Sequence, residues 1–345
     1  MKKIIKFFAL FALTAAAVFA QTNSASDFIM ESYDSTRIAR YKGTSADVTI
    51  PDGVITIGPR AFANNKNITS VTMPASVKTI GGGAFSGCTN LTSVSAPGAE
   101  SIIGSAFINT GLIKADFPQV TDIEPAAFAL CTKLTSVNFP KLTTIGSEKS
   151  KGYGAFEDCT SLTKVSFPAV TSIGKDTFKI SESFAGADIG LTEIDLPQVT
   201  VIYDNAFENQ QRLTIVSFPS VTKVGEHAFR NCIGITNVYL PLATELKNSF
   251  SYDTKKYKLT RVQTITLGTV RLGNTDAGSR LEGLERFYRT EGGEPGTYKY
   301  ISERIGGKWE KQSTTAQPPT ANDPRSGPPQ PKTMQQQKAE SAKKR

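Results

Sequence analysis

Leu91-Thr-Ser-Val-Ser-Ala-Pro97 and Leu134-Thr-Ser-Val-Asn-Phe-Pro140 share one pattern, which returns as Leu162-Thr-Lys-Val-Ser-Phe-Pro168 and Leu213-Thr-Ile-Val-Ser-Phe-Pro219. The β-branched residues in each stretch favour a pleated backbone. Proline closes each stretch because it has no N–H to donate to a neighbouring strand. Each copy therefore predicts one short strand that ends at its proline.

The pattern belongs to a repeat of about 22 residues that runs through most of the chain. A proline recurs at Pro51, Pro74, Pro97, Pro118, Pro140, Pro168, Pro197, Pro219 and Pro241. A phenylalanine keeps step with it at Phe62, Phe85, Phe107, Phe128, Phe156, Phe178, Phe207, Phe229 and Phe250. A third apolar column between the two is assigned to Ile57, Ile80, Ile103, Ile123, Ile145, Ile173, Ile202, Val224 and Leu246.

Three apolar columns predict that the repeats stack on one another. No single repeat can bury its own large apolar side chains, so stacking supplies the hydrophobic burial. Strands that enter the stack from the same side are parallel and about 4.8 Å apart. We therefore predict about nine coils of short parallel strands, which form a curved slab around one hydrophobic spine.

The repeat unit resembles the BspA-type leucine-rich repeat of secreted and cell-surface bacterial proteins. The resemblance rests on Leu-Thr-Ser-Val-x-Phe-Pro-x-Val-Thr-x-Ile-Gly-x-x-Ala-Phe-x-x-Cys-Thr and covers about residues 34 to 265. The opening segment from Tyr41 to Val54 also resembles the usual first coil of such proteins. The resemblance implies a leucine-rich-repeat solenoid of BspA-like type. It also implies adhesion to host matrix proteins or to other cells, with which members of this family are often associated.

The chain divides into four predicted segments. Residues 1–20 combine a lysine-rich start with an apolar run and small residues before Gln21, which is typical of a cleavable secretory signal. The run is shorter than the roughly 18 residues of a membrane span, and we expect no transmembrane segment elsewhere. Residues 21–250 are predicted to form the solenoid and residues 251–312 a small β-rich capping segment. Residues 313–345 are basic and rich in proline and glutamine, so we predict a disordered tail.

Composition argues against several classes of protein. The single histidine, His227, cannot supply a two-histidine or three-histidine metal site, and no phosphate-loop or dinucleotide motif occurs. We therefore predict no enzymatic activity, no metal and no cofactor, and we interpret His227 as an exposed turn residue. The net charge of +8 comes mostly from the two ends of the chain. The signal contains three lysines, and the tail contains six basic residues and two acidic ones. The nearly neutral body predicts no nucleic-acid binding.

Four cysteines share one repeat position, three residues after the column phenylalanine: Cys88, Cys131, Cys159 and Cys232. Secretion and an even number of cysteines favour disulfides. Equivalent side chains in a stack point the same way, however, and only Cys131 and Cys159 belong to adjacent coils. We therefore interpret the four cysteines as buried thiols that pack or hydrogen-bond weakly at a turn.

Two departures from the repeat are insertions, one from Ser147 to Tyr153 and the other from Lys179 to Gly190. They lie one coil apart, so they could share an edge of the stack, either as functional loops or as tolerated variation in solvated turns. Six glycines follow the isoleucine column and are expected to ease a turn there: Gly58, Gly81, Gly104, Gly146, Gly174 and Gly225.

The outward positions of the predicted strands carry hydroxyl, amide and charged groups. Nine of them are candidate ligand-binding residues: Lys114, Asp116, Ser136, Asn138, Lys164, Ser166, Glu193, Asp195 and Tyr239. They favour a non-enzymatic recognition or adhesion protein, secreted or held at the cell surface or in the periplasm, that binds a protein or glycan such as host extracellular matrix. The alternative is a structural or assembly component of the cell envelope that acts through its basic tail.

Overall fold

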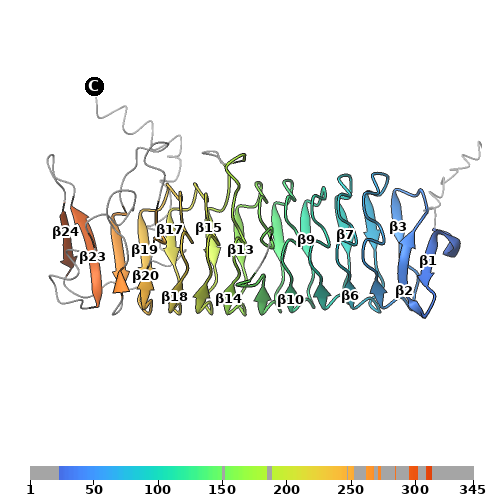
Figure 1. The fold of residues 1–345 in the computed structure, drawn as a ribbon, viewed down its shortest axis with the longest axis horizontal. Coiled ribbons are helices and arrows are strands. Elements are labelled where there is room, and N and C mark those ends of the chain that lie inside the picture. Colours follow the sequence, from blue (N-terminus) through green and yellow to red (C-terminus); the bar gives the residue numbers. More distant parts are fainter. Residues whose placement is uncertain are drawn as a thin grey trace, which may run out of the picture.

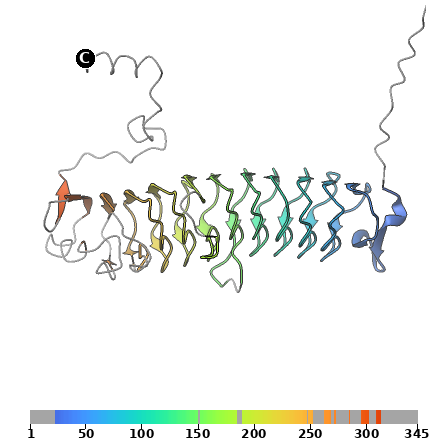
Figure 2. The same ribbon diagram turned by 90° about the horizontal axis from the view of Figure 1, so that it is seen from above.

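The chain winds into a long stack of coils (Figures 1 and 2). The computed structural model describes residues 23–149, 152–184, 189–246, 248–251, 262–267, 271–272, 284, 295–301 and 308–312. Each coil places one strand on each of two sides of the stack and closes through a third side that carries the phenylalanine column. The coils follow one another in a row that curves only slightly in both views. This architecture confirms the predicted solenoid of about nine coils of parallel strands.

The first side consists of the strands predicted from the repeat. These are β3 (Asp47–Thr49), β5 (Ser70–Thr72), β7 (Ser93–Ser95), β9 (Lys114–Asp116), β11 (Ser136–Asn138), β13 (Lys164–Ser166), β15 (Glu193–Asp195), β17 (Ile215–Ser217), β19 (Asn237–Leu240) and β21 (Thr264–Leu267). Side chains alternate along a strand, so Val165 of β13 is buried whereas Lys164 and Ser166 are exposed. We call the outward surface of these strands the strand face.

A second strand in every coil is a feature that sequence analysis did not predict. These two-residue strands are β4 (Thr56–Ile57), β6 (Thr79–Ile80), β8 (Ser101–Ile102), β10 (Asp122–Ile123), β12 (Thr144–Ile145), β14 (Ser172–Ile173), β16 (Val201–Ile202), β18 (Lys223–Val224), β20 (Glu245–Leu246) and β22 (Arg271–Leu272). Together with β1 (Phe28–Glu31) and β2 (Asp34–Tyr41) they form one 12-stranded sheet, the second sheet. The strands of the first side form four separate ladders instead.

One residue of the isoleucine column differs from the prediction. Ile102 is fully buried and pairs with its equivalents in β6 and β10, whereas Ile103, which we had assigned to the column, is only partly buried. Two consecutive isoleucines fit the apolar pattern equally well. The spacing decides between them, because Ile102 lies five residues before Phe107, as Ile80 lies before Phe85.

The phenylalanine column forms the predicted spine. Consecutive rings stack face to face from Phe62 to Phe250, with centroids 4.8 to 5.7 Å apart. Each of these rings is at most 2% exposed. The strand-end phenylalanines add a shorter second row, and Phe117 and Phe139 stack at 5.5 Å. The alignment that the repeat pattern predicted is therefore confirmed.

The turns of the third side need left-handed backbone at two positions that flank the phenylalanine column. Residues two before it have positive φ in most coils: Arg60, Gly83, Ser105, Ala126, Asp176, Asn205, His227 and Asn248. Residues two after it do so as well: Asn64, Gly87, Asn109, Leu130, Asp158, Asn209 and Asn231. Of the six glycines expected to ease a turn, only Gly146 has a positive φ. Most of these glycines therefore do not need left-handed backbone, but at Gly58 and Gly81 an added β-carbon would lie within 2.6 Å of a carbonyl oxygen in the neighbouring strand.

Antiparallel strands close both ends of the stack. At the start, β1 pairs with β2, and Tyr41 stacks on Phe62 at 5.0 Å, in the place of a column phenylalanine. At the other end, β21 is followed by β23 (Gly296–Ile301) and β24 (Lys308–Gln312), both paired antiparallel. Trp309 and Tyr298 of these strands are buried. Such strands cover apolar residues that would otherwise be exposed where parallel stacking stops.

Some predictions lie outside the described residues. They concern the secretory signal at 1–20, the tail at 313–345 and the start of the capping segment at 252–261. Among the residues that the structure does describe, no helix has the length and apolar character needed to cross a membrane.

We predict that Phe128→Ala lowers the free energy of unfolding by about 3 to 5 kcal/mol, because the change leaves a cavity between two stacked rings. Phe128 is fully buried and its neighbours Phe107 and Phe156 lie 5.2 and 5.1 Å away. Chemical denaturation followed by circular dichroism measures the loss. The control is Phe184→Ala, because Phe184 is 42% exposed and its removal should change stability little. Equal losses in both variants would contradict the role of the column.

Candidate functional site

The strand face brings eight of the nine candidate residues onto four successive strands. In the β9–β11 pair, Lys114 lies opposite Ser136 and Asp116 opposite Asn138. In the β13–β15 pair, Lys164 and Ser166 lie opposite Glu193 and Asp195 in the same way. The ninth, Tyr239, lies on β19, in a separate five-stranded ladder. The face therefore presents two parallel rows of side chains, one at the first position of each strand and one at the third.

Most of these side chains pair with the next coil. Asn138 Nδ2 donates to Asp116 Oδ1 at 2.8 Å, and Ser166 Oγ donates to Asp195 Oδ2 at 2.8 Å. These bonds orient the carboxylates along the stack.

Lys164 and Glu193 form an ion pair at 2.5 Å with side chains 57% and 40% exposed. An exposed pair of this kind contributes at most about 1 kcal/mol to stability. The pair therefore sets the charge pattern of the face more than it holds the coils together.

Threonines before the strands have a structural role that sequence analysis did not assign. The hydroxyl of Thr135 donates to the carbonyl of Ile113 in the preceding coil at 3.0 Å, and that of Thr192 donates to Thr163 at 3.1 Å. A matching series runs along the second sheet, where the hydroxyl of Thr222 donates to the carbonyl of Thr200 at 3.1 Å. These hydroxyl protons connect coils, so they are not available to a ligand.

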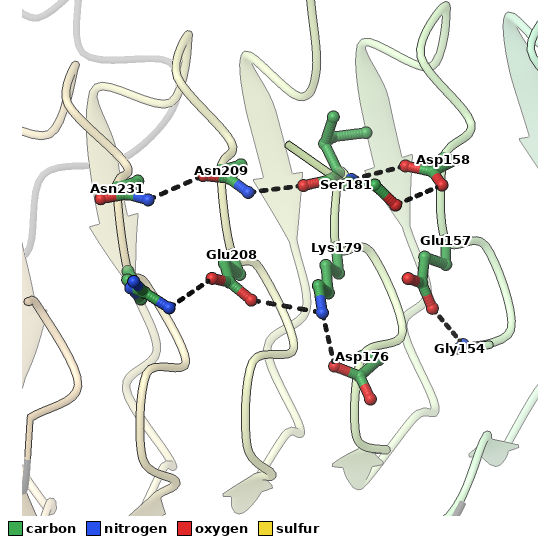
Figure 3. A network of polar contacts seen from close by, with 11 residues as sticks. Gly154, Glu157, Asp158, Asp176, Lys179, Ser181, Glu208, Asn209 and Asn231 are labelled. Carbon is green, nitrogen blue, oxygen red and sulfur yellow. Dashed lines mark hydrogen bonds and ion pairs between the residues drawn. The ribbon is translucent and has the colours of Figure 1, made fainter. Parts of the chain in front are cut away.

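A line of alternating charges crosses four coils on the third side (Figure 3). It occupies the position after the column phenylalanine, and we call Glu157, Lys179, Glu208 and Arg230 the polar ladder. Lys179 Nζ lies 3.5 Å from Glu208 Oε2, and Arg230 Nη1 lies 3.2 Å from Glu208 Oε1. The other described coils carry Ala, Ser or Ile at this position. The alternation was not predicted, although it is visible in the sequence once the repeats are aligned.

A second row of polar contacts runs beside the ladder, one residue further along each coil (Figure 3). The backbone N–H and the hydroxyl of Ser181 both donate to the Asp158 carboxylate at 2.6 Å. Asn209 Nδ2 donates to the carbonyl of Ile180 at 2.6 Å, and Asn231 Nδ2 donates to Asn209 Oδ1 at 2.9 Å. These bonds satisfy the buried side chains of Asp158, Asn209 and Asn231.

Burial and neighbouring charges alter the ionisation of the ladder. Burial raises the pKa of Glu157 to about 7, against the opposing effects of the Gly154 N–H and of Lys179, and with further increases from Asp176 and Asp158. Burial alone would lower the pKa of Lys179, but Glu208, Asp176 and Glu157 outweigh it and raise the pKa. Asp176 Oδ1 is buried 3.6 Å from Lys179 Nζ, without a hydrogen bond.

The two insertions do not share an edge. The first leaves the coil between β12 and Phe156, and its Glu148 reaches Lys223 of the second sheet at 3.9 Å. Lys223 in turn lies 5.4 Å above the ring of Tyr203. The second insertion follows Phe178 and is bonded to Asp158 through Ser181. The expectation of a common edge was wrong because the insertions lie at opposite ends of the phenylalanine segment.

The cysteines are free and buried, as predicted. Each thiol donates to the carbonyl of the column phenylalanine in the preceding coil, at 2.9 to 3.1 Å. Gln210 donates in the same way at the equivalent position of its coil. Burial raises the pKa of Cys88 and of Cys131 to about 11, so these thiols are held in their unreactive form.

His227 is a partly exposed turn residue with a positive φ. Its Nε2 lies 3.9 Å from Glu226 Oε1. Across the described residues, no group of three or more His, Cys, Asp or Glu side chains could hold a metal ion. The arrangement on the third side acts as a set of links between coils.

Comparison with known families agrees with the fold. Residues 55–185 and 180–267 match the family described as BspA type Leucine rich repeat region, in six copies. No curated protein matches the chain.

Solved structures with a similar fold include three from bacteria. A leucine-rich repeat protein of T. pallidum is 24% identical, with 62% of this chain and 91% of that chain covered and a TM-score of 0.39. A leucine-rich cell surface protein of Faecalibacterium prausnitzii is 20% identical, with 70% and 86% covered and a TM-score of 0.35. The pneumococcal vaccine antigen PcpA is 14% identical, with 68% and 69% covered and a TM-score of 0.29.

We predict that Glu157→Gln removes a pH dependence of stability. The folded state raises the pKa of Glu157 from its ordinary 4.5 to about 7 and so binds more protons than the unfolded state between these values. Stability from this group is therefore fully present below pH 4.5 and is lost as the pH rises to about 7. The free energy of unfolding, measured by urea denaturation, should be about the same for variant and parent near pH 4.5. At about pH 8 it should be larger for the variant.

The control for this measurement is Glu193→Gln, which removes a carboxylate from the exposed strand face, where solvent screens it. We expect the parent's decline of stability with pH to persist in that variant. An equally steep decline of stability with pH in Glu157→Gln would contradict the assignment of the pH dependence to Glu157.

We predict that none of the four cysteines reacts with a thiol reagent in the folded protein at neutral pH. All four thiols are buried and donate hydrogen bonds, and the reactive thiolate is suppressed. Labelling with and without guanidinium, followed by mass spectrometry, should show four modifications only after unfolding. Rapid labelling of the folded chain, or fewer than four modified sites after unfolding without reductant, would contradict buried free thiols.

Proposed function

The chain belongs to the BspA-type leucine-rich repeat family, and on that premise we propose that it is a secreted or cell-surface recognition protein without enzymatic activity. Its partner is a protein or glycan that lies along the strand face. The family is consistent with protein binding in general, and the strand face is the part of this chain that supports a more specific role.

The registered rows on β9, β11, β13 and β15 are the observation that carries the proposal. Coils repeat at about 4.8 Å, so the rows present polar groups at regular intervals to an extended ligand. Apart from Asp47 of β3, the N-terminal strands β3, β5 and β7 carry Ser and Thr at these positions, whereas the middle coils carry several charges. Asp116 and Asp195 lie in one row, and Lys114 and Lys164 lie in the other. A partner must match both rows, which favours a specific protein or glycan over non-specific attraction.

The test compares two double variants that remove equivalent ion pairs from different sides of the stack. Lys164→Ala with Glu193→Ala removes the strand-face pair, and Lys78→Ala with Glu100→Ala removes a pair at 2.8 Å beside the second sheet. Both changes leave the net charge unaltered and remove exposed side chains. Binding of the full chain to immobilised extracellular-matrix proteins and glycans should weaken about tenfold or more only in the first variant.

Equal binding by both variants, with melting temperatures like that of the parent, would contradict recognition through the strand face. Loss of binding on neutralising the lysines and arginines of residues 313–345, with both pair variants unaffected, would instead favour an assembly role for the basic tail.

A further inference from the structure

A groove opens on the third side of the stack at its N-terminal end, far along the chain from the middle of the strand face. It has a volume of about 610 Å³ and is lined by residues 39–41 of β2 and by residues 59–67 of the following coil. Three of the lining residues are basic, and none of them is acidic. The groove therefore differs from the polar ladder, where carboxylates and cations alternate on the same side of the stack.

Two guanidinium groups in this groove lack a partner among the residues that the structure describes. Arg40 and Arg60 are exposed and, in the part of the chain that the structure describes, neither forms an ion pair or a side-chain hydrogen bond. Lys179 and Arg230, which also lie on the third side, both contact Glu208 instead. Each free guanidinium offers planar donors that match an oxyanion in bidentate geometry.

The backbone conformation at residue 60 is a second reason to assign a ligand-binding role to Arg60. Its φ of 56° is left-handed, a conformation that favours glycine or asparagine. Gly83, Asn205 and Asn248 occupy the same place in other coils. A long basic side chain is therefore not what the turn requires. The Arg60 side chain lies beside Gly83 of the next coil. A β-carbon added to Gly83 would lie 3.4 Å from Arg60 Cγ.

Amide side chains complete the groove. Asn64, Asn65 and Asn67 line it beside the arginines, and the Asn65 carbonyl oxygen accepts from the N–H groups of Asn67 and Ile68. Lys66 Nζ donates to the carbonyl of Gly87 in the next coil, which holds this third cation against the groove wall. Amides both donate to and accept from hydroxyl groups.

We propose that this groove binds the oxyanion groups of an acidic polysaccharide. Arg40 and Arg60 bind sulfate or carboxylate groups, and the asparagine amides bind neighbouring sugar hydroxyls. The unbalanced positive charge favours an anionic ligand, and the amides beside it favour a hydroxyl-rich chain over an acidic peptide. The site is separate from the strand face, so it stands whether or not the proposed function of that face holds.

The test uses the full chain and two defined probes, a heparin-derived oligosaccharide that carries sulfates and an oligogalacturonate that carries only carboxylates. Arg40→Gln with Arg60→Gln should weaken binding of at least one probe about tenfold or more at about 0.15 M salt. The matched control, Lys133→Gln with Lys149→Gln, removes the same charge from exposed residues outside the groove and should change the affinity much less. Binding of heparin alone assigns sulfate, and binding of oligogalacturonate assigns carboxylate.

Three results would overturn the proposal. The first is equal loss of affinity in the groove variant and the control, which means attraction by net charge alone. The second is absence of binding by either probe. The third is displacement of the bound oligosaccharide by poly-glutamate at equal concentration of charge, which would assign an acidic protein instead. Unchanged melting temperatures exclude unfolding as the cause, and Lys164→Ala with Glu193→Ala should leave oligosaccharide binding intact.

Discussion

Every other feature of this chain depends on the contact between one coil and the next. A coil of about 22 residues has too little interior to bury its own phenylalanine, isoleucine and leucine side chains, and they become buried only when a neighbour covers them. The face-to-face phenylalanine rings from Phe62 to Phe250 are the most regular expression of this constraint. The antiparallel strands at both ends follow from the same requirement, because the first and last coils each lack a neighbour on one side.

Stacking also has to satisfy the polar groups of tightly turning backbone. The left-handed residues on either side of the phenylalanine column direct N–H groups towards the next coil, as in the bond from Asn64 N to Ser86 O at 2.7 Å. Thiols, threonine hydroxyls and one glutamine amide bond to carbonyls of the preceding coil. Polar residues that resemble ligand-binding groups in the sequence thus serve as links between coils. The side chains left for recognition are those that project from the strand face and from the N-terminal groove.

The middle of the stack is where its regularity is modified. Both insertions occur there, and the uncharged residue after the column phenylalanine is replaced by Glu157, Lys179, Glu208 and Arg230 in turn. Alternating charges let neighbouring coils attract each other where the inserted chain interrupts simple packing. Burial raises the pKa of Glu157 to about 7. The charge of this side chain, and with it the stability of the packing around it, therefore changes with pH near neutrality. The charged side chains of β13 and β15 on the strand face lie on the coils that carry Lys179 and Glu208 of the polar ladder.

Repeat spacing and residue type determined the solenoid, the number of coils, the phenylalanine spine and the buried thiols, because a 22-residue period leaves few ways to bury three apolar columns. The outward positions of the strands also followed from alternation, so the candidate face could be listed residue by residue. Pattern alone could not choose between Ile102 and Ile103, reveal the second sheet, or place the left-handed turns beside the phenylalanines. Those features depend on which backbone groups of adjacent coils meet. That Arg40 and Arg60 lack partners among the described residues likewise became visible only when the coils were placed side by side, because hydrogen-bond partners in this chain lie about one repeat away in the sequence.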